Sequence, residues 1–298
     1  MGSRKALGFV ALAAILGYLY MDSFDPESLA DARVLVTGAS TGIGEQMAYH
    51  YARAGAQLAL TARSEDALLK VKIKCLELGA KKVSLLRADM GEPDARIQVV
   101  EQAVSELGGL DYLVLNHIGA TPFQMWDGDV SHVRWLMEVN FISYVDLANA
   151  ALPYLVQSHG SIVVLSSLTG KTPIPFAAPY IASKSALEGF FVSLRQELTM
   201  RETPVSITLC VLGLVDTQSA MKKTTSCAWS GSVVPLLSKS DIPISKFLAL
   251  YKVHFGFSKD NSKQITGISI LNYLEVISLL HFSFVNTVTA VFIRKLIF

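Results

Sequence analysis

The chain has 298 residues, of which 51% are apolar and 17% are charged. This length fits one large α/β domain or two small ones, and the composition excludes disorder as the main state, because disordered chains are charge-rich and poor in apolar residues. With 26 Lys and Arg against 25 Asp and Glu, the net charge of +1 predicts no nucleic-acid partner.

The N-terminal segment combines a basic flank with an apolar run. Arg4 and Lys5 precede sixteen uncharged residues, Ala6 to Met21. As a helix this run would span about 24 Å, less than the roughly 30 Å of a bilayer core. The bulky residues at its end favour an uncleaved signal-anchor in residues 1–22 over a cleaved signal peptide, which would give a secreted protein, or a core helix. The positive flank predicts membrane attachment with the rest of the chain in the lumen.

Between the two ends, short apolar segments alternate with helical patterns. Regular polar alternation is absent, as in strands that helices cover on both faces. The pattern predicts a doubly wound parallel sheet in one α/β domain, with its ligand beyond the carboxyl ends of the strands. Six strands are expected, at Val34 to Thr37, Leu58 to Ala62, Val83 to Arg87, Tyr112 to Asn116, Ser161 to Ser166 and Ser206 to Leu212.

A glycine-rich turn follows the first expected strand. Gly38, Gly42 and Gly44 have the spacing Gly-x3-Gly-x-Gly and lead into a helical pattern from Glu45 to Ala54. Gly38 lets the chain turn, Gly42 lets the backbone approach a pyrophosphate, and Gly44 lets the helix pack on the strand. Free amides at the helix N-terminus attract phosphate. The turn therefore indicates a dinucleotide site.

The end of the second expected strand distinguishes NADP from NAD. An acidic residue there would bind a ribose 2′-hydroxyl, whereas this chain has Arg63 and Ser64. A guanidinium pairs with phosphate, so NADP is favoured; the other interpretation of Arg63 is a solvated loop charge. Asp89 after the third strand and Asn116 at the end of the fourth are candidates for cofactor contacts or simple turn formers.

Tyr180 and Lys184 lie four residues apart at the start of a helical stretch through Leu198. Residues i and i+4 share a helix face. A phenol with a pKa near 10 transfers protons usefully at neutral pH only if a cation lowers that pKa, and Lys184 is spaced to do so. Lys184 is also a candidate hydrogen-bond donor to the nicotinamide ribose. By itself the pair is equally typical of a helix surface.

Two further polar residues join this candidate catalytic group. Ser167, just past the fifth expected strand, is better placed than Ser166 to hydrogen-bond a substrate oxygen; the alternative is a turn serine. Asn140 is polar within an apolar helical stretch. It could hold a water that links Lys184 to solvent, or it could kink or cap the helix.

The three cysteines are widely spaced, at Cys75, Cys210 and Cys227. They form no CxxC pair, and an odd number fits no disulfide framework. We therefore expect no metal site, and we interpret the cysteines as buried thiols or bystanders.

These motifs, in this order and spacing, resemble the short-chain dehydrogenase/reductase family and, within it, the 11-beta-hydroxysteroid dehydrogenases. The resemblance covers residues 1 to about 223 and implies an NADP-binding catalytic domain at residues 31–223, in the endoplasmic-reticulum membrane with the domain in the lumen. The similarity to the 11-beta group is carried by the N-terminal anchor-like run and five segments: Phe24 to Pro26, Leu113 to His117, Met137 to Phe141, Ser166 to Lys171 and Cys210 to Thr217.

The resemblance implies an NADP-dependent oxidoreductase that interconverts a secondary alcohol and a ketone on an apolar substrate such as a hydroxysteroid. It implies a catalytic tetrad of Asn140, Ser167, Tyr180 and Lys184, with Ser167 and Tyr180 touching the substrate. The implied cofactor-binding residues are Gly38, Ser40, Thr41, Gly42, Ile43, Gly44, Arg63, Ser64, Asp89, Met90, Asn116, His117, Ile118, Tyr180, Lys184, Val215 and Thr217.

Residues 224–298 do not resemble the family, although its substrate-capping helices, last strand and dimer-forming tail would be expected there. The homodimer therefore stays open. Ile265 to Ile293 carries few charges and fits a membrane span, an interfacial hairpin or a buried element. The intact tetrad favours an enzyme, whereas the unfamiliar C-terminus leaves an alternative: a membrane-attached NADP-binding or interaction protein with little or no turnover.

Overall fold

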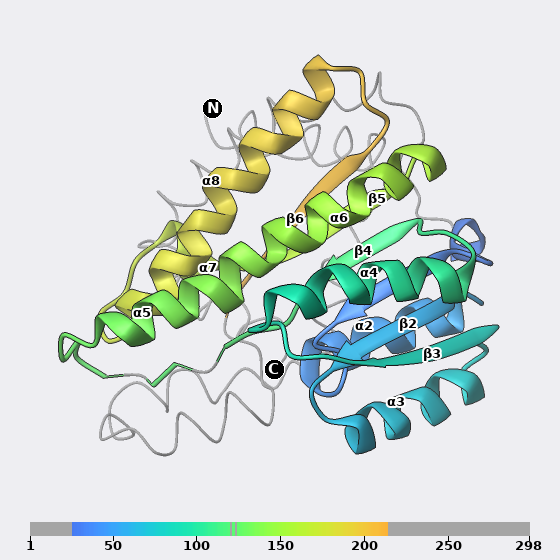
Figure 1. Ribbon diagram of the computed structural model, residues 1–298, viewed down its shortest axis with the longest axis horizontal. Helices are drawn as coiled ribbons and strands as arrows, with labels where there is room; N and C mark the ends of the chain where they lie inside the picture. Colours follow the sequence, from blue (N-terminus) through green and yellow to red (C-terminus); the bar gives the residue numbers. More distant parts are fainter. Residues whose placement is uncertain (1–25, 120, 123, 214–298) are drawn as a thin grey trace, which may run out of the picture. The chain divides into compact units, whose positions relative to one another are not determined.

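Six parallel strands form one sheet in the order β3-β2-β1-β4-β5-β6 (Figure 1). The computed structural model describes residues 26–119, 121–122 and 124–213. The strand order places a topological switch between β1 and β4, where open α/β sheets bind their ligands. The strands are β1 Arg33–Thr37, β2 Gln57–Ala62, β3 Lys82–Arg87, β4 Tyr112–Leu115, β5 Ser161–Ser167 and β6 Ser206–Leu212.

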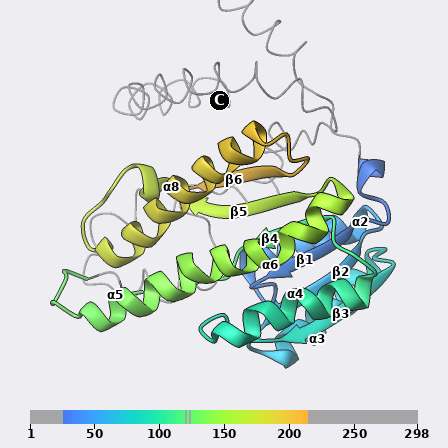
Figure 2. The ribbon, with the colours of Figure 1, turned by 45° about the horizontal axis from the view of Figure 1, so that its top comes forward.

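Helices cover both faces of the sheet. Helices α4, α6 and α8 pack on one face and α2 and α3 on the other (Figures 1 and 2). Leu35, Leu113, Leu147 and Phe191 belong to the core beneath α4, α6 and α8. The helical elements are the 3-10 helix η1 Pro26–Leu29, α2 Gly42–Arg53, α3 Glu65–Glu77, α4 Pro93–Leu107, α5 Val130–Met137, the π-helix η2 Glu138–Ile142, α6 Ser143–Ser158, α7 Leu168–Lys171 and α8 Ala178–Met200.

The parallel sheet and its six strands are confirmed: β6 has the expected ends, and each of the other strands differs by one residue at one end. Strand β4 stops before Asn116, because the Asn116 N–H donates to the Thr37 hydroxyl (2.9 Å). Strand β5 includes Ser167, which pairs in register with Leu212 of β6. Ser167 therefore lies at the carboxyl edge of the sheet and not in the loop beyond it.

Several predictions fall outside the described residues: the anchor in residues 1–22, the segment 224–298, and the cofactor contacts Val215 and Thr217. Within the described part of the chain, no helix is both long and apolar enough to cross a membrane. The same residues contain no cluster of His, Cys, Asp and Glu that could hold a metal ion. Lumenal location and the homodimer stay predictions.

Cys75 and Cys210 are free, buried thiols. Burial raises the pKa of each to about 12, so neither is a thiolate at neutral pH. Their interpretation as packing residues agrees with this geometry.

Candidate active site

The glycine turn after β1 packs directly against the segment after β4. Gly38 and Gly42 have φ angles of 62° and 65°, a left-handed conformation that favours glycine. A Cβ at Gly38 would lie 2.7 Å from the Cα of His117, and one at Gly44 would collide with the Asn116 side chain and the Gly38 carbonyl. Gly44 therefore lets the start of α2 pack closely on Asn116 and on the turn at Gly38. The sequence predicted only that Gly44 lets the helix pack on the strand.

Asn116 holds this turn in place. Its side-chain amide donates to the backbone carbonyls of Thr37 (3.1 Å) and Gly38 (3.0 Å). The amide therefore shapes the turn itself, and this bracing role depends on β1 and β4 being neighbours in the sheet.

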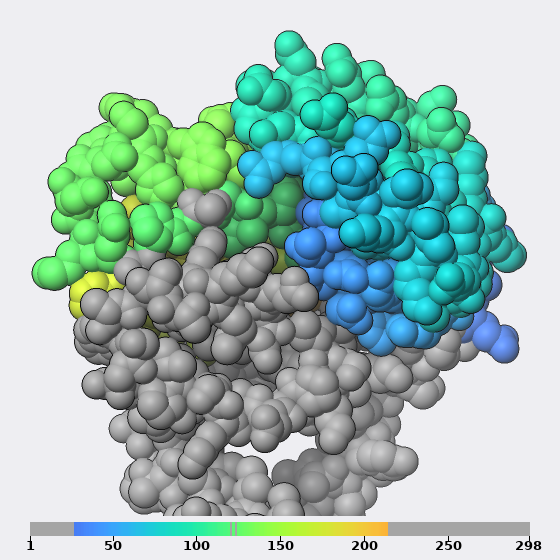
Figure 3. Space-filling model, turned by 90° about the horizontal axis from the view of Figure 1, so that it is seen from below, coloured from blue at the N-terminus to red at the C-terminus, as the bar shows by residue number. Residues whose placement is uncertain are grey.

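The N-terminus of α2 is available for an anion. Its N-cap residue, Thr41, is exposed and makes no side-chain hydrogen bond to the first turn. The first N–H groups of a helix lack partners within the helix and attract phosphate. This geometry fits a dinucleotide pyrophosphate beside Ser40, Thr41, Gly42 and Ile43. Figure 3 shows, on one face of the molecule, blue surface from the first described residues and green surface from the middle of the chain.

Two arginines lie at the neighbouring ends of β2 and β3. Arg63 and Ser64 follow β2 and are exposed, and the Ser64 hydroxyl caps α3 by accepting from the N–H of Ala67 (3.4 Å). Ala62 pairs in register with Arg87, whose Nε donates to the Arg63 carbonyl (3.3 Å). The sequence predicted Arg63 but missed Arg87, which the register of β2 and β3 would have indicated.

In the turn after β3, the side chains of Asp89 and Met90 are used within the protein, which leaves the backbone for cofactor contacts. The exposed Asp89 accepts a hydrogen bond from the N–H of Gly91 (2.9 Å). This bond within the turn agrees with the interpretation of Asp89 as a turn former. The Met90 side chain is buried in the core. Any cofactor contact of Met90 therefore involves its backbone.

The His117 ring lies inside the protein and not on the cofactor edge. Its Nδ1 lies 2.9 Å from the Thr37 hydroxyl and its Nε2 lies 2.7 Å from the Ser143 hydroxyl. Burial lowers the pKa of His117 to about 3, so the ring is neutral. The neighbouring Ile118 is exposed. A cofactor contact from His117 would have to use its backbone.

Ser167, Tyr180 and Lys184 come together at the carboxyl edge of the sheet. Ser167 ends β5 and hydrogen-bonds Tyr180 near the start of α8. The Lys184 Nζ lies 5.9 Å from the centroid of the Tyr180 ring and donates to the carbonyl of Leu165 (2.7 Å). Ser166 is buried, and its hydroxyl has no hydrogen-bond partner among the described residues. The geometry thus selects Ser167 as the serine beside Tyr180.

Burial is the largest influence on the pKa values of Tyr180 and Lys184. Burial raises the pKa of Tyr180 above its ordinary value, and the hydrogen bond with Ser167 opposes that rise. Burial lowers the pKa of Lys184 to about 8. The expectation that Lys184 lowers the pKa of Tyr180 stays a prediction: burial is the larger influence on Tyr180 in this structure, and the Lys184 ammonium donates to the carbonyl of Leu165.

Asn140 connects the segment after β4 to the start of α8. It lies in the π-helix η2, which agrees with a helix-distorting role. Its side-chain oxygen accepts from the N–H of Gly119 (2.7 Å), and its nitrogen donates to the Ser183 hydroxyl (3.2 Å). Ser183 in turn donates to the carbonyl of Tyr180 (2.7 Å). Asn140 thus helps to position the turn that carries Tyr180.

An ion cluster, formed by the buried Arg96 and the partly exposed Glu138 and Asp146, supports the same region. Arg96 is 1% exposed, and its Nη1 lies 2.8 Å from Glu138 Oε1 and 2.7 Å from Asp146 Oδ2. Its Nε donates to the carbonyl of Met90 (3.0 Å). The Arg96 cluster joins the turn after β3 to the π-helix that holds Asn140. Sequence reasoning missed it, because no local pattern marks partners so far apart in the chain.

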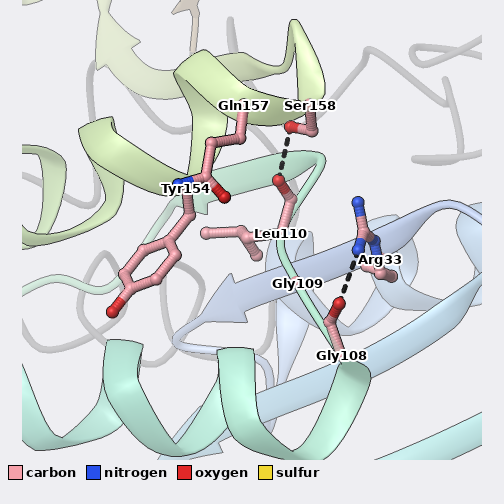
Figure 4. Close-up of a pocket in the computed structure, with 7 residues that line it drawn as sticks. All are labelled: Arg33, Gly108, Gly109, Leu110, Tyr154, Gln157 and Ser158. Atoms are coloured by element: carbon pink, nitrogen blue, oxygen red, sulfur yellow. Dashed lines mark hydrogen bonds between the residues drawn. The ribbon is translucent and has the colours of Figure 1, made fainter.

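A hollow of about 250 Å³ lies at the opposite edge of the sheet, where β1 and β4 begin (Figure 4). Arg33 and Ser158 in its wall donate to the carbonyls of Gly108 (2.7 Å) and Leu110 (2.6 Å). Because its polar groups are bonded to each other and it is remote from Tyr180, we do not assign the reaction to it.

A family model described as short chain dehydrogenase matches residues 32–228, about two thirds of the chain. The chain belongs to the short-chain dehydrogenase/reductase family. This confirms the family predicted from the motifs and makes the protein a member of an oxidoreductase family.

Curated relatives place the chain within the hydroxysteroid 11-beta-dehydrogenase group of this family. It is 72% identical over 215 residues to the Hydroxysteroid 11-beta-dehydrogenase 1-like protein of Xenopus tropicalis, covering 72% of this chain and 75% of the relative. The Gallus gallus protein of the same name is 63% identical over 214 residues, with the same coverage of 72% and 75%.

Solved structures support the fold. A short-chain dehydrogenase from Burkholderia cenocepacia, in complex with NADP, is 27% identical and has a TM-score of 0.61. The match covers 68% of this chain and 80% of that structure. The bound NADP is a finding on that relative and does not by itself establish the cofactor of this chain.

Proposed function

We propose that this short-chain dehydrogenase/reductase is an NADP-dependent enzyme that interconverts a secondary alcohol and a ketone on an apolar substrate, with hydroxysteroids as the candidate class. The observation that carries the proposal is the meeting of Ser167, Tyr180 and a buried Lys184 at the carboxyl edge of the sheet. The printed name of the Xenopus tropicalis relative supports the substrate class.

In this mechanism the chain's own residues bind and protonate the substrate oxygen. Ser167 and Tyr180 hydrogen-bond the carbonyl, and the Tyr180 hydroxyl donates the proton as the oxygen becomes an alcohol. The charged Lys184 stabilises negative charge that develops on the Tyr180 oxygen. Bound NADPH would supply the hydride. The reverse reaction uses the same groups, with Tyr180 accepting the proton.

The preference for NADP rests on Arg63 and Arg87. Both are exposed at the end of the strands where the adenosine ribose of a dinucleotide would lie, and no acidic residue occupies the position of Arg63. A guanidinium binds the 2′-phosphate that NADP carries and NAD lacks.

Replacing Arg63 with alanine is expected to weaken NADPH binding by roughly tenfold or more, because a charge-assisted hydrogen bond is worth about 1.5 to 3 kcal/mol. Arg87→Ala should weaken it in the same direction. NADH binding should change little in either variant, since NADH lacks the phosphate. Fluorescence titration of both cofactors measures the effect, with Arg53→Ala, an exposed arginine in the last turn of α2, as the control. Equal losses for NADPH and NADH would contradict the assignment.

The proposed function itself is tested with the purified full chain. We expect oxidation of NADPH with ketosteroids and reduction of NADP with the matching hydroxysteroids, with NADPH favoured over NADH. Cofactor binding is titrated separately. A different outcome would support the alternative, a membrane-attached cofactor-binding protein: tight NADPH binding with no turnover on any member of a broad steroid and ketone panel. The complete group of Ser167, Tyr180 and Lys184 disfavours this alternative.

A further inference from the structure

Three chemically active residues follow one another along one face of α8. Tyr180, Lys184 and Glu188 are spaced four residues apart within Ala178–Met200, so they share a helix face. The proposed function, on which this inference rests, uses Tyr180 and Lys184. It leaves Glu188 without a role.

Lys184 is a buried cation in largely apolar surroundings. The residue is 3% exposed, and its Nζ lies 5.6 Å from the Tyr144 ring centroid and 5.9 Å from that of Tyr180. The titratable groups that face it are Tyr180 on its own helix, Tyr144 on α6 and His117 after β4. Burial raises the pKa of both tyrosines and lowers that of His117, so all three are neutral near pH 7.

Glu188 lies one turn beyond Lys184 on α8, and its negative charge raises the pKa of Lys184 against the effect of burial. Its side chain is 13% exposed, and its Oε2 lies 3.9 Å from the Nζ of Lys171 on α7. Its Oε1 is buried and has no hydrogen-bond partner among the described residues. A carboxylate oxygen buried without a donor is costly for the fold, so local hydrogen bonding does not account for this residue.

Helix α7 packs tightly where Lys184 and Glu188 lie. A Cβ at Gly170 would lie 3.0 Å from the backbone carbon of Lys184, and the Ser185 hydroxyl donates to the Gly170 carbonyl (2.8 Å). The same helix places the positive charge of Lys171 beside Glu188. The negative charge of Glu188 therefore acts on both Lys171 and Lys184, and the positive charge of Lys171 offsets part of its effect on Lys184.

We propose that Glu188 is a positioning residue that keeps the buried Lys184 ammonium protonated, so that Lys184 can support proton transfer by Tyr180. The physical basis is that opposite charges attract more strongly in a protein interior than in water. Burial alone drives Lys184 toward its neutral form, and the negative charge of Glu188 opposes that drive.

The direction in which the Lys184 pKa is expected to shift determines how the proposal is tested. Lys184 is active when charged, so kcat/KM falls as the pH rises through its pKa in the free enzyme. Glu188→Gln removes the charge but keeps the shape. We expect it to move the alkaline limb of the kcat/KM profile to lower pH by about one unit. With a starting pKa of about 8, activity at pH 8 would then fall by about fivefold.

Three companion variants separate charge from shape. Lys171→Gln should move the alkaline limb the opposite way, to higher pH, because it removes the cation that competes for Glu188. Glu188→Asp keeps the charge and should restore most of the wild-type profile. Glu197→Gln, the same change at an exposed position of α8, should leave the profile in place. Thermal melts verify that each variant is folded.

A second measurement makes the result independent of turnover. The titration of Lys184 can be followed by NMR of carbon-13-labelled lysine side chains in the cofactor-free protein, with Lys184→Met to assign the signal. A lower Lys184 pKa in Glu188→Gln supports the proposal even if no steroid is turned over, an outcome that would count against the proposed function alone. An unchanged Lys184 pKa in a folded Glu188→Gln protein would overturn the proposal.

Discussion

Replacing Tyr180 with phenylalanine is expected to lower kcat by roughly 10² to 10⁴, the usual contribution of general acid-base catalysis. Phenylalanine keeps the ring that packs beside Lys184 but lacks the hydroxyl that transfers the proton and bonds to Ser167. Steady-state assays with NADPH and the best ketone of the panel measure the loss. Binding of NADPH should change by less than about twofold, because the tyrosine hydroxyl acts on the substrate.

Tyr154→Phe is the matched control for this substitution. Tyr154 lies near the end of α6, at the hollow on the opposite edge of the sheet, so removal of its hydroxyl should leave kcat unchanged (Figure 4). If Tyr180→Phe retained turnover within about tenfold of the wild type, Tyr180 would not be the proton donor.

The double substitution Glu138→Gln with Asp146→Asn is expected to lower the free energy of unfolding by about 3 kcal/mol, because it leaves a buried guanidinium without a counter-charge. Arg96 is 1% exposed and contacts both carboxylates. Each single substitution should cost about 1 kcal/mol, since the other carboxylate remains. Denaturant unfolding monitored by circular dichroism measures these differences.

The control for this prediction removes the buried positive charge that both carboxylates contact. Adding Arg96→Met to the double variant should recover part of the lost stability, because an apolar side chain needs no counter-charge. Glu77→Gln, which breaks the exposed pair with Lys74, should cost less than about 1 kcal/mol. Strictly additive single effects, with no recovery in the triple variant, would show that the three side chains do not act as one ion cluster.

Much of the fold could be predicted from the sequence because its signals are local. Apolar runs such as the one ending at Thr37, followed by Gly38 and a helical pattern, indicate a strand, a turn and a helix within a few residues. The Tyr180 and Lys184 spacing likewise belongs to one helix. These features depend on neighbours in the chain, so periodicity and glycine positions reveal them.

The features that were missed depend on contacts between elements. Arg87 meets Arg63 through the register of β2 and β3, and Arg96 meets Glu138 through the packing of α4 against the region of η2. Nothing within a few residues of either arginine indicates its partner. The burial of His117 follows from the same kind of contact, because its ring fills space between Thr37 and Ser143.

By itself, the sequence determined the doubly wound fold, the glycine turn and the identity of the residues that meet at the carboxyl edge. The tertiary structure decided how these residues are used. It placed Ser167 beside Tyr180 and enclosed Lys184 among aromatic rings, where burial lowers the pKa of Lys184 and the charge of Glu188 opposes that change. The reason is physical: residue type sets the chemistry available, but pKa values and counter-charges depend on burial and distance, which only the packed chain defines.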